Sequence, residues 1–331
     1  MDTRLYIDDV PENWPVSTGH LPPATQVDTL LAEAHTRFKS LDEGKVADYI
    51  PALAATPKDL FGICVVATSG DVFSIGDTEY EFSIQSISKP FVFALVSQAL
   101  SCQQARYKIG VNATGLPFNS VMAIELNESR TMNPMVNAGA IATTSLVPGA
   151  TAEEKWQFIH DGLSRLAGRR LTLNTEVYES EAASNQRNQG IAHLLEGYGR
   201  MYFDPLQATD VYTKQCSLNV SVRDLAVMGA TLADGGVNPL TKERVLDADR
   251  CKRVLAALAT AGLYEESGDW LYEVGLPGKS GGIVTVAPGK GGLATFAPQL
   301  DSAGNSIKGQ LVTKFLSERL GLNLFASQAA A

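Results

Sequence analysis

The sequence predicts an α+β fold in which one antiparallel sheet is built from both ends of the chain. Three observations support this prediction. Strand-like segments occur in pairs near both ends, over 63–75 and 283–297, and the chain from 86 to about 263 is mainly helical. An amphipathic helical pattern stands outside each strand pair. This order favours a sheet flanked by terminal helices, with a helical lobe inserted in the middle.

The first part of the chain predicts an arm, a helix and a hairpin. Residues up to about Ala24 are rich in proline and are expected to lie on the surface or on a partner subunit. Thr25 is expected to cap a helix with apolar residues at helical spacing. These are Val27, Leu30, Leu31, Ala34 and Phe38. Strands follow over 63–67 and 72–75, joined by the turn Ser69-Gly70-Asp71.

Helices are predicted over 152–166, 222–232 and 248–261, with loops rich in glycine and asparagine between them. A second hairpin pairs 283–287 with 293–297. Asn305 or Ser306 then begins a final helix that turns one apolar face to the core. That face carries Ile307, Leu311, Phe315 and Leu320.

Composition and charge narrow the class of protein. The 331 residues carry a net charge of −9, and the pI is near 5.0, which argues against a surface that binds nucleic acid or anionic membranes. No apolar run is long enough to span a membrane, and Met1-Asp2-Thr3-Arg4 does not begin a secretory signal. We therefore expect a cytoplasmic protein.

Cysteine and histidine patterns indicate neither a metal site nor a histidine-based triad. The four cysteines are scattered without a Cys-x-x-Cys pair, which favours free thiols. The four histidines lack metal-ligand spacing and a Gly-x-Ser-x-Gly elbow. Gly278-Lys279-Ser280 resembles the end of a phosphate-binding loop, but Glu273 stands where its first glycine belongs.

Ser86 and Lys89 form the first candidate catalytic motif. Residues three apart on a helix point the same way, so Ser86 Oγ and Lys89 Nζ can meet at the start of a helix. Pro90 supports a helix start, because proline is tolerated in the first turn. A buried lysine has a lowered pKa and can act as the base that activates a serine. The apolar run 91–96 would provide this burial.

Lys279-Ser280-Gly281 forms the second motif, and the strand-like segment 283–287 follows it directly. Lys-[Ser/Thr]-Gly on an edge strand facing Ser-x-x-Lys is the combination used by penicillin-recognising serine enzymes. A single Ser-x-x-Lys is expected roughly once by chance in a chain of this length, so the two motifs together carry the prediction of a nucleophilic serine.

We expect an N-terminal arm over 1–24 and one catalytic domain over 25–331. The domain is expected to have two lobes, a sheet lobe over about 25–85 and 265–331 and a helical lobe over about 86–264. Ser86 would lie in the cleft between them, opposite Lys279-Ser280-Gly281 on the sheet edge.

From about Gly44 to Gly309 the sequence resembles serine-dependent glutaminases, a family with a β-lactamase/transpeptidase-like fold. Several sequence blocks carry this resemblance in the family's order. They are 44–51 (GKVADYIP), 85–90 (QSISKP), 133–141 (NPMVNAGAI), Ser180-Glu181 with Arg187-Asn188, Tyr212 before Cys216-Ser217, Gly262-Leu263-Tyr264, and 276–281 (LPGKSG).

The resemblance implies hydrolysis of the side-chain amide of L-glutamine to L-glutamate and ammonia by a homodimer or homotetramer, without metal or organic cofactor. It implies Ser86 as nucleophile, Lys89 as its base and Tyr264 as the group that assists proton transfer to ammonia. The residues implied for the substrate pocket are Tyr49, Gln85, Asn137, Glu181, Asn188 and Tyr212. Glu181 supplies the anion that a substrate ammonium needs, and amides and phenols supply donors for its carboxylate.

One segment departs from the family. Relatives carry a longer glycine-rich stretch after Lys-Ser-Gly, with a valine whose N–H joins the oxyanion hole. Here Gly281-Gly282-Ile283 runs straight into the strand, and Gly282 occupies the place of that valine.

Two alternatives stay open at the level of sequence. A β-lactamase or penicillin-binding relative would use Ser217-Leu218-Asn219 as its Ser-x-Asn element. A catalytically silent protein that binds glutamine or glutamate is favoured by the short Gly281–Ile283 loop alone.

Overall fold

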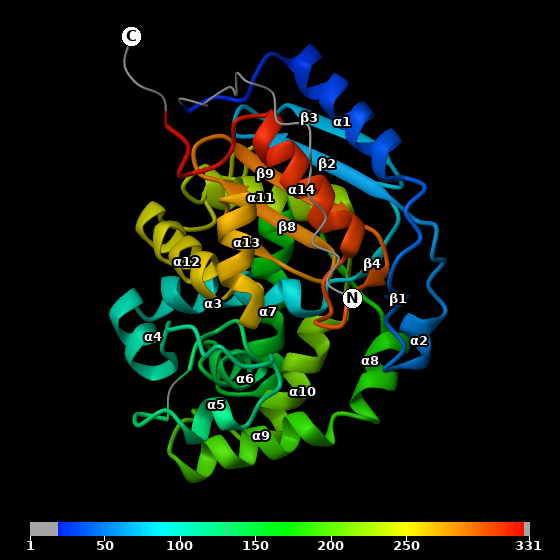
Figure 1. Cartoon of the computed structure of the whole chain (residues 1–331). Helices are drawn as coiled ribbons and strands as arrows, with labels where there is room; N and C mark the ends of the chain where they lie inside the picture. Colours follow the sequence, from blue (N-terminus) through cyan, green and yellow to red (C-terminus); the bar gives the residue numbers. More distant parts are fainter. Residues whose placement is uncertain (1–18, 131, 328–331) are drawn as a thin grey trace.

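The centre of the fold is a five-stranded antiparallel sheet with strands from both ends of the chain (Figure 1). The computed structural model of the chain describes residues 19–130 and 132–327. The strand order is β3-β2-β9-β8-β7. The strands are β2 (Gly62–Ala67), β3 (Val72–Gly76), β7 (Gly278–Lys279), β8 (Ile283–Ala287) and β9 (Gly291–Phe296). Pairing of β2 with β9 joins the two chain ends, which confirms the predicted sheet.

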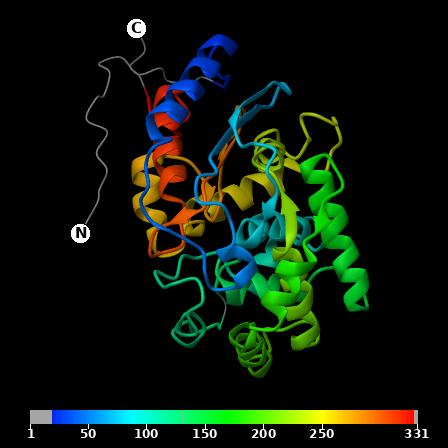
Figure 2. The ribbon, with the colours of Figure 1, turned by 90° about the vertical axis from the view of Figure 1, so that its right-hand side faces the viewer.

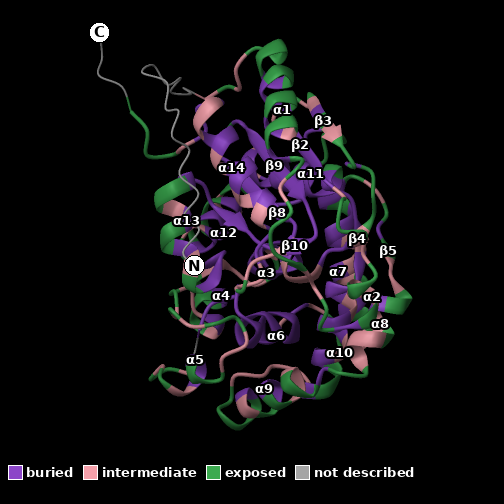
Figure 3. Ribbon diagram, turned by 45° about the vertical axis from the view of Figure 1, so that its right-hand side comes forward, coloured by how far each residue is buried: buried purple, intermediate pink, exposed green. Residues whose placement is uncertain are grey.

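The sheet is covered on both faces, and the alternation of side chains along β2 shows how. Ile63 and Val65 pack with α1 (Ala24–Phe38) and α14 (Ile307–Arg319), whereas Cys64 and Val66 pack with α11 (Val222–Ala233). Figure 2 shows blue α1 beside red α14 on one side of the sheet. Figure 3 shows the buried residues concentrated in the sheet and the elements next to it, while the outer turns of α1 are exposed.

The chain between the two hairpins forms most of the other helices. They are α3 (Ser88–Ala99), α4 (Cys102–Ile109), α5 (Met122–Glu125), α6 (Asn137–Ser145), α7 (Ala152–Ala167), α8 (Thr175–Ala182), α9 (Gln186–Gly197), α10 (Pro205–Cys216) and α12 (Ala248–Ala261), with α2 (Pro51–Ala54) before them and α13 (Ser267–Val274) after them. Two 3₁₀ turns, η1 (Gln85–Ile87) and η2 (Tyr264–Glu266), also occur. None of the helices in the described ranges is long and apolar enough to cross a membrane.

Most predicted elements occur within one or two residues of their expected ends. All five apolar residues assigned to the buried face of the first helix are buried. The final helix begins after Ser306, whose hydroxyl accepts a hydrogen bond from the N–H of Gly309, as predicted. Ile307 on that helix is only half-buried. Residues 1–18 of the predicted arm lie outside the described residues.

Two predicted boundaries are wrong. Thr25 does not cap α1. The N-cap is Pro23, which has an extended conformation, and Thr25 lies inside the helix, where its carbonyl accepts a hydrogen bond from the Thr29 hydroxyl. The last strand begins at Gly291 instead of residue 293. A Cβ at Gly291 would stand 2.3 Å from the carbonyl oxygen of Val66, so glycine allows the close approach that extends the ladder.

A small three-stranded sheet holds the chain just before Ser86. Its order is β4-β6-β5, with β4 (Phe82–Ser83), β6 (Leu218–Val220) and β5 (Thr172–Leu173). A further pair, β1 (Lys45–Val46) with β10 (Gln299–Leu300), connects the two ends of the chain a second time. The N–H of Ile84 donates to the carbonyl of Leu218 at 2.8 Å, which fixes the entry to η1.

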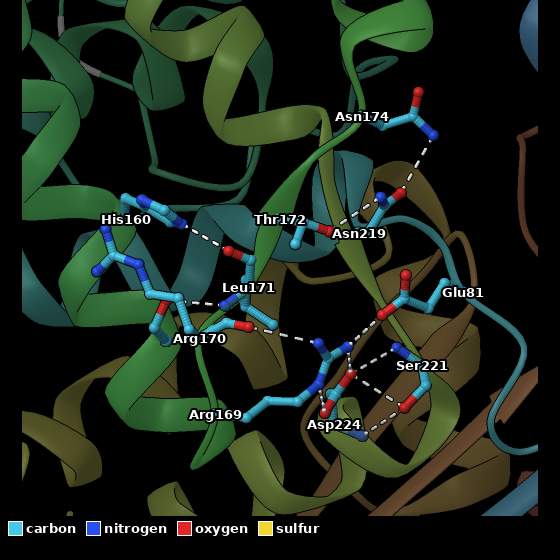
Figure 4. Close-up of polar contacts among 11 residues, drawn as sticks. Glu81, His160, Arg169, Arg170, Leu171, Thr172, Asn174, Asn219, Ser221 and Asp224 are labelled. Atoms are coloured by element: carbon cyan, nitrogen blue, oxygen red, sulfur yellow. Dashed lines mark hydrogen bonds and ion pairs between the residues drawn. The ribbon is translucent and has the colours of Figure 1, made fainter.

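An ion-pair network anchors this small sheet to the start of α11 (Figure 4). Ser221 and Asp224 form a capping box, in which each side chain binds the other residue's backbone N–H. Arg169 donates from Nε to Asp224 Oδ1 at 2.8 Å and from Nη2 to Glu81 Oε1 at 2.8 Å. Asp224 is buried, so its negative charge is stabilised by these partners and not by water.

Asp224→Ala should therefore lower the free energy of unfolding by about 2–4 kcal/mol, because it removes the acceptor of the Ser221 N–H from the capping box and leaves Arg169 without its buried acceptor. Urea denaturation at neutral pH measures this loss. Glu81→Gln serves as the control, since its exposed pair with Arg169 should contribute less than about 1 kcal/mol. Equal losses for the two variants would contradict this assignment.

Candidate active site

A cavity of about 970 Å³ lies where the edge of the large sheet meets the middle helices. It is lined by residues that are far apart in the sequence, and they include all nine predicted substrate-binding residues. These are Tyr49, Gln85, Ser86, Asn137, Glu181, Asn188, Tyr212, Tyr264 and Gly282. Ser280 and Gly281 line the same cavity, so the two sequence motifs meet here.

Ser86 lies in a 3₁₀ turn that leads directly into α3. The sequence predicts a helix that opens at Ser86, and the structure begins the α-helix two residues later, at Ser88. The tighter turn has a local cause. Gln85 has a φ of +49°, which is costly for a residue with a Cβ, and its carbonyl accepts a hydrogen bond from the Ser88 hydroxyl at 2.8 Å. Ser86 is half-buried at the cavity wall.

Lys89 is enclosed by protein and is only 1% exposed. Its Nζ donates to Asn137 Oδ1 at 2.8 Å, at the start of α6. Burial lowers the pKa of Lys89 to about 8, although Cys216 and Glu181 act to raise it. The side chain is therefore close to the protonation state that a general base requires.

Asn137 connects Lys89 to the rest of the pocket. Its Nδ2 donates to Asn188 Oδ1 at 3.0 Å, and its Oδ1 also accepts a hydrogen bond from the Tyr212 hydroxyl at 3.5 Å. Because Asn188 uses its oxygen for Asn137, the amide NH₂ of Asn188 is the end left to donate.

Glu181 presents an unpaired carboxylate oxygen. Its Oε2 is buried and has no hydrogen-bond partner among the described residues. Burial raises the pKa of Glu181 to about 7, against the opposing effects of a hydrogen bond with Gln85 and the charge of Lys89. An unpaired buried carboxylate costs free energy and indicates a cationic ligand group.

The Gln85 side chain forms hydrogen bonds with both Tyr49 and Ser83. Its Oε1 accepts a hydrogen bond from the Tyr49 hydroxyl at 3.2 Å, and its Nε2 donates to Ser83 Oγ at 3.1 Å. Tyr49 is 63% exposed, so its ring lies at the rim while its hydroxyl takes part in the site. The strained backbone of Gln85 is thus fixed on both sides.

Tyr264 stands beside the serine. It opens η2 with a φ of +58°, and it is almost fully buried. Burial raises the pKa of its phenol, which a side-chain hydrogen bond with Ser86 lowers in part. A neutral phenol at neutral pH can donate a proton or a hydrogen bond to a group leaving Ser86.

The loop after Lys-Ser-Gly is short and closely packed. Gly281 has a φ of +124°, and a Cβ at Gly282 would meet the Phe82 ring and the Thr295 carbonyl oxygen, both at 3.2 Å. Glycine therefore suits both positions, and the backbone of Gly282 lies at the cavity wall.

Sequence reasoning missed Phe118, and it gave Lys279 no role of its own. The Phe118 ring lies 5.9 Å from Lys89 Nζ and 5.3 Å from the Tyr264 ring. Lys279 was identified only as part of its motif, and its Nζ lies 3.6 Å from the centre of the Tyr264 ring. Nothing in the local pattern around Phe118 marks it, whereas the motif could have identified Lys279.

Known proteins match the chain over nearly its whole length. The family model named Glutaminase matches residues 44–325. Glutaminase 2 of Yersinia pestis is 65% identical over 316 residues, which span 95% of this chain and 93% of that protein. The glutaminase of Brucella canis is 50% identical over 288 residues, which span 86% of this chain and 91% of that protein.

Solved structures give the same result. The structure described as "Probable glutaminase ybaS" has a TM-score of 0.91 and 46% sequence identity, and the match covers 92% of this chain and 100% of that one. Mglu in its tris and glutamate form has a TM-score of 0.87 and 37% identity, with 92% of this chain and 68% of that one covered.

The environment of Glu181 predicts a dependence of stability on pH. Its pKa rises from an ordinary 4.5 to about 7 on folding. The contribution of Glu181 to folding stability is therefore fully present below pH 4.5, where the carboxyl is protonated, and is lost as pH rises through 7. Glu181→Gln should therefore leave stability unchanged near pH 4.5 and should raise the free energy of unfolding at pH 8 by about 2 kcal/mol.

Thermal unfolding of both proteins at the two pH values measures this difference. Glu179→Gln on the same helix is the control, because Glu179 is exposed and its replacement should have little effect at either pH. A stability gain that is equal at the two pH values would contradict a raised pKa for Glu181.

Proposed function

The chain belongs to the glutaminase family and hydrolyses glutamine to glutamate, and we propose that the reaction proceeds through a glutamyl-enzyme on Ser86. One observation carries this proposal. Ser86 is hydrogen-bonded to Tyr264 and lies one helical turn before Lys89, whose pKa burial lowers to about 8. A candidate nucleophile and a candidate acid thus line one cavity, and the candidate base is hydrogen-bonded to Asn137 in the cavity wall.

In the first half of the reaction, neutral Lys89 takes the proton of Ser86 as Oγ attacks the side-chain carbonyl carbon of glutamine. The tetrahedral intermediate then collapses, and the bond between that carbon and the amide nitrogen breaks. Tyr264 assists transfer of the proton held by Lys89 to the nitrogen, so that ammonia leaves and Lys89 is neutral again. The product of this half is an ester between Ser86 Oγ and the glutamyl group.

In the second half, water attacks the ester carbonyl while Lys89 accepts its proton. The Ser86–carbonyl bond breaks, Ser86 recovers a proton, and glutamate leaves. The negative charge that develops on the carbonyl oxygen would be stabilised by the N–H groups of Ser86 and Gly282. Ser86 lies in the 3₁₀ turn that leads into α3, and a single such backbone donor typically contributes about 3 kcal/mol to lowering the barrier.

Substrate recognition follows from the polarity of the pocket. The ammonium group of glutamine would pair with Glu181 Oε2, which is buried without a partner among the described residues. The carboxylate would accept a hydrogen bond from Asn188, and one from Tyr212 once its hydroxyl turns away from the 3.5 Å contact with Asn137. Tyr49 and Gln85 would lie at the rim of the pocket. We assign Asn137 to orienting Lys89 and Asn188, since it binds both.

The remaining proposals concern cellular setting and assembly. A cytoplasmic location fits the four free cysteines, because a reducing compartment keeps thiols unpaired. We also propose a homodimer or homotetramer, following the family resemblance, and a single catalytic domain of a sheet lobe and a helical lobe.

The alternatives are not favoured. The Ser-x-Asn element of a β-lactamase would be Ser217-Leu218-Asn219, but Asn219 Nδ2 donates to Thr172 Oγ1 and its Oδ1 accepts from Asn174. Asn219 therefore serves the small sheet instead of the cavity. Ammonia release from glutamine, measured beside hydrolysis of a chromogenic β-lactam, separates a glutaminase from a β-lactamase and from a silent binding protein.

Ser86→Ala should lower kcat by a factor of about 10³ or more while glutamate still binds, because the nucleophile is lost and the pocket remains. Lys89→Ala should be nearly as damaging, and the double variant should be no slower than Ser86→Ala alone, since the two residues act as a unit. Ammonia release and calorimetric titration measure the two effects. Ser86→Ala activity within about tenfold of wild type would rule out the covalent mechanism.

Glu181→Gln should remove discrimination between glutamine and an analogue that lacks the α-amino group. The wild-type protein should prefer glutamine strongly in kcat/KM, because the ammonium pairs with a desolvated carboxylate, and the loss in the variant should be several kcal/mol. An exposed pair would cost less than about 1 kcal/mol. If both proteins discriminate equally, Glu181 does not hold the ammonium.

A further inference from the structure

A chain of buried side-chain hydrogen bonds ends on the backbone carbonyl that precedes the proposed nucleophile. Ser88 Oγ donates to the Gln85 carbonyl at 2.8 Å, and Gln215 Nε2 donates to Ser88 Oγ at 3.0 Å. The Thr144 hydroxyl shares its proton between Gln215 Oε1 and the Ala140 carbonyl, each at 3.1 Å. Ser88, Gln215 and Thr144 are at most 1% exposed, and none of them lines the cavity.

The direction of the hydrogen bonds in this chain is set from its far end. Because the Gln215 amide oxygen accepts from Thr144, the amide NH₂ is the end that faces Ser88. A hydroxyl has one proton, so a Ser88 oxygen that accepts from Gln215 can give its own proton to the Gln85 carbonyl. Hydrogen bonds in such a chain strengthen one another where water is excluded.

The chain also connects three elements that carry groups of the candidate site. Thr144 is on α6, which begins at Asn137. Gln215 is near the end of α10. Ser88 is the first residue of α3, directly after the 3₁₀ turn that contains Ser86. A displacement of any one of these helices is therefore resisted by buried hydrogen bonds to the others.

The Gln85 carbonyl and the Ser86 N–H belong to one peptide group. That group is planar and trans, so its C=O and its N–H point in opposite directions. The carbonyl accepts from both the N–H and the hydroxyl of Ser88, which uses both of its lone pairs. Gln85 has a φ of +49°, which is unfavourable for a residue with a Cβ and persists only where contacts hold it. The contacts that hold the carbonyl thus also set the direction of the Ser86 N–H.

We propose that Ser88 and Gln215 are positioning residues for the reaction. They orient the peptide group that contains the Ser86 N–H, so that this donor faces the oxyanion of the reacting amide. The proposal rests on the function proposed above, in which this N–H stabilises the oxyanion. Because Ser88 and Gln215 do not line the cavity, they act through that peptide group and not on the substrate. Their loss should therefore weaken binding of the tetrahedral intermediate more than binding of the substrate.

The experiment compares Ser88→Ala and Gln215→Met with the wild-type protein. Ser88→Ala removes the side-chain donor to the Gln85 carbonyl, whereas Gln215→Met keeps the size of the side chain but removes the amide that directs the Ser88 proton. Each variant should lower kcat for glutamine by a factor of about 10–100, because a misdirected donor loses part of the effect of an oxyanion donor. KM should change by less than about threefold.

Two ligands separate binding of the intermediate from binding of the ground state. One is glutamate, whose carboxylate is planar. The other is the glutamine analogue in which a boronic acid replaces the side-chain amide. Its boron forms a bond with Ser86 Oγ while Lys89 takes the hydroxyl proton, and the product is a tetrahedral boronate anion with an oxygen in the oxyanion position.

Calorimetric titration measures the Kd of both ligands. In Ser88→Ala and Gln215→Met the Kd of the boronic acid should rise by about the factor by which kcat falls. The Kd of glutamate should change by less than about threefold. A role limited to stability would not produce this difference between the two ligands.

Ser317→Ala is the matched control. Ser317 is also fully buried, and its hydroxyl donates to the carbonyl of Val274 at 2.6 Å, at a place where neither residue lines the cavity. This variant should lose stability to a similar extent but keep the wild-type kcat and the wild-type affinity for the boronic acid. Thermal unfolding of each variant shows whether it is folded at the assay temperature.

The two variants remove one chain at different residues, so Gln215→Met serves if Ser88→Ala does not fold. Folded variants with kcat and boronic acid affinity within about threefold of wild type overturn the proposal. An equal loss of affinity for glutamate and for the boronic acid also overturns it.

Ser86→Ala distinguishes failure of this proposal from failure of the proposed function. If Ser86→Ala binds the boronic acid as tightly as wild type, the covalent mechanism fails. If Ser86→Ala loses this affinity while Ser88→Ala and Gln215→Met keep it, the covalent mechanism stands and only the role proposed for Ser88 and Gln215 fails.

Discussion

The proposed chemistry depends on keeping the amine of Lys89, one helical turn after Ser86, out of water. An exposed lysine is protonated at neutral pH and cannot accept the proton of a serine. The fold meets this constraint by passing α3 through the interior, where the residues from Ser88 to Ser97 are all buried. The amine then has one fixed acceptor, Asn137 at the start of α6, at 2.8 Å. Burial is unfavourable for the ammonium form, and in the proposed mechanism this cost makes the neutral amine available as a base.

The same constraint explains why the two ends of the chain are joined in one sheet. Part of the cavity wall is formed by Ser280, Gly281 and Gly282, which follow the edge strand β7 near the C-terminal hairpin, whereas Ser86 follows the N-terminal hairpin. Pairing of β2 with β9 sets the position of one end against the other, and the small sheet fixes the backbone that leads to Gln85. The cavity is therefore assembled by long-range pairing of strands, and Tyr264 and Ser280 reach it from one stretch of chain.

Backbone strain and an unpaired polar atom are both present at this site. Gln85 and Tyr264 both have positive φ, although neither is glycine, and both contact reacting or binding groups. Glu181 holds a carboxylate oxygen with no partner among the described residues. These features oppose stability, and the remainder of the core offsets them. A substrate ammonium that pairs with Glu181 would neutralise its buried carboxylate. Substrate binding would therefore remove one of these unfavourable contributions to stability.

Much of this arrangement could be predicted from the sequence, because periodicity and spacing report local geometry. The buried face of α1 and the cap at Ser306 follow directly from such patterns. The 3₁₀ turn at Gln85 could not be predicted, since it depends on contacts with Ser88 and with the small sheet. The start of α1 was missed because two prolines set an extended entry that replaces a side-chain cap. The contacts that Phe118 and Lys279 make with Tyr264 depend on tertiary packing, which no local pattern encodes.

The most direct test of the account is to observe the covalent intermediate. Enzyme mixed with isotopically labelled glutamine, quenched with acid at several times across the first turnover, digested and analysed by mass spectrometry, reveals any glutamyl ester and its position. The account predicts one labelled glutamyl group on the peptide that contains Ser86, present before steady state and absent in Ser86→Ala. A glutamyl group on a different residue, or none at any time while ammonia is released, would contradict it.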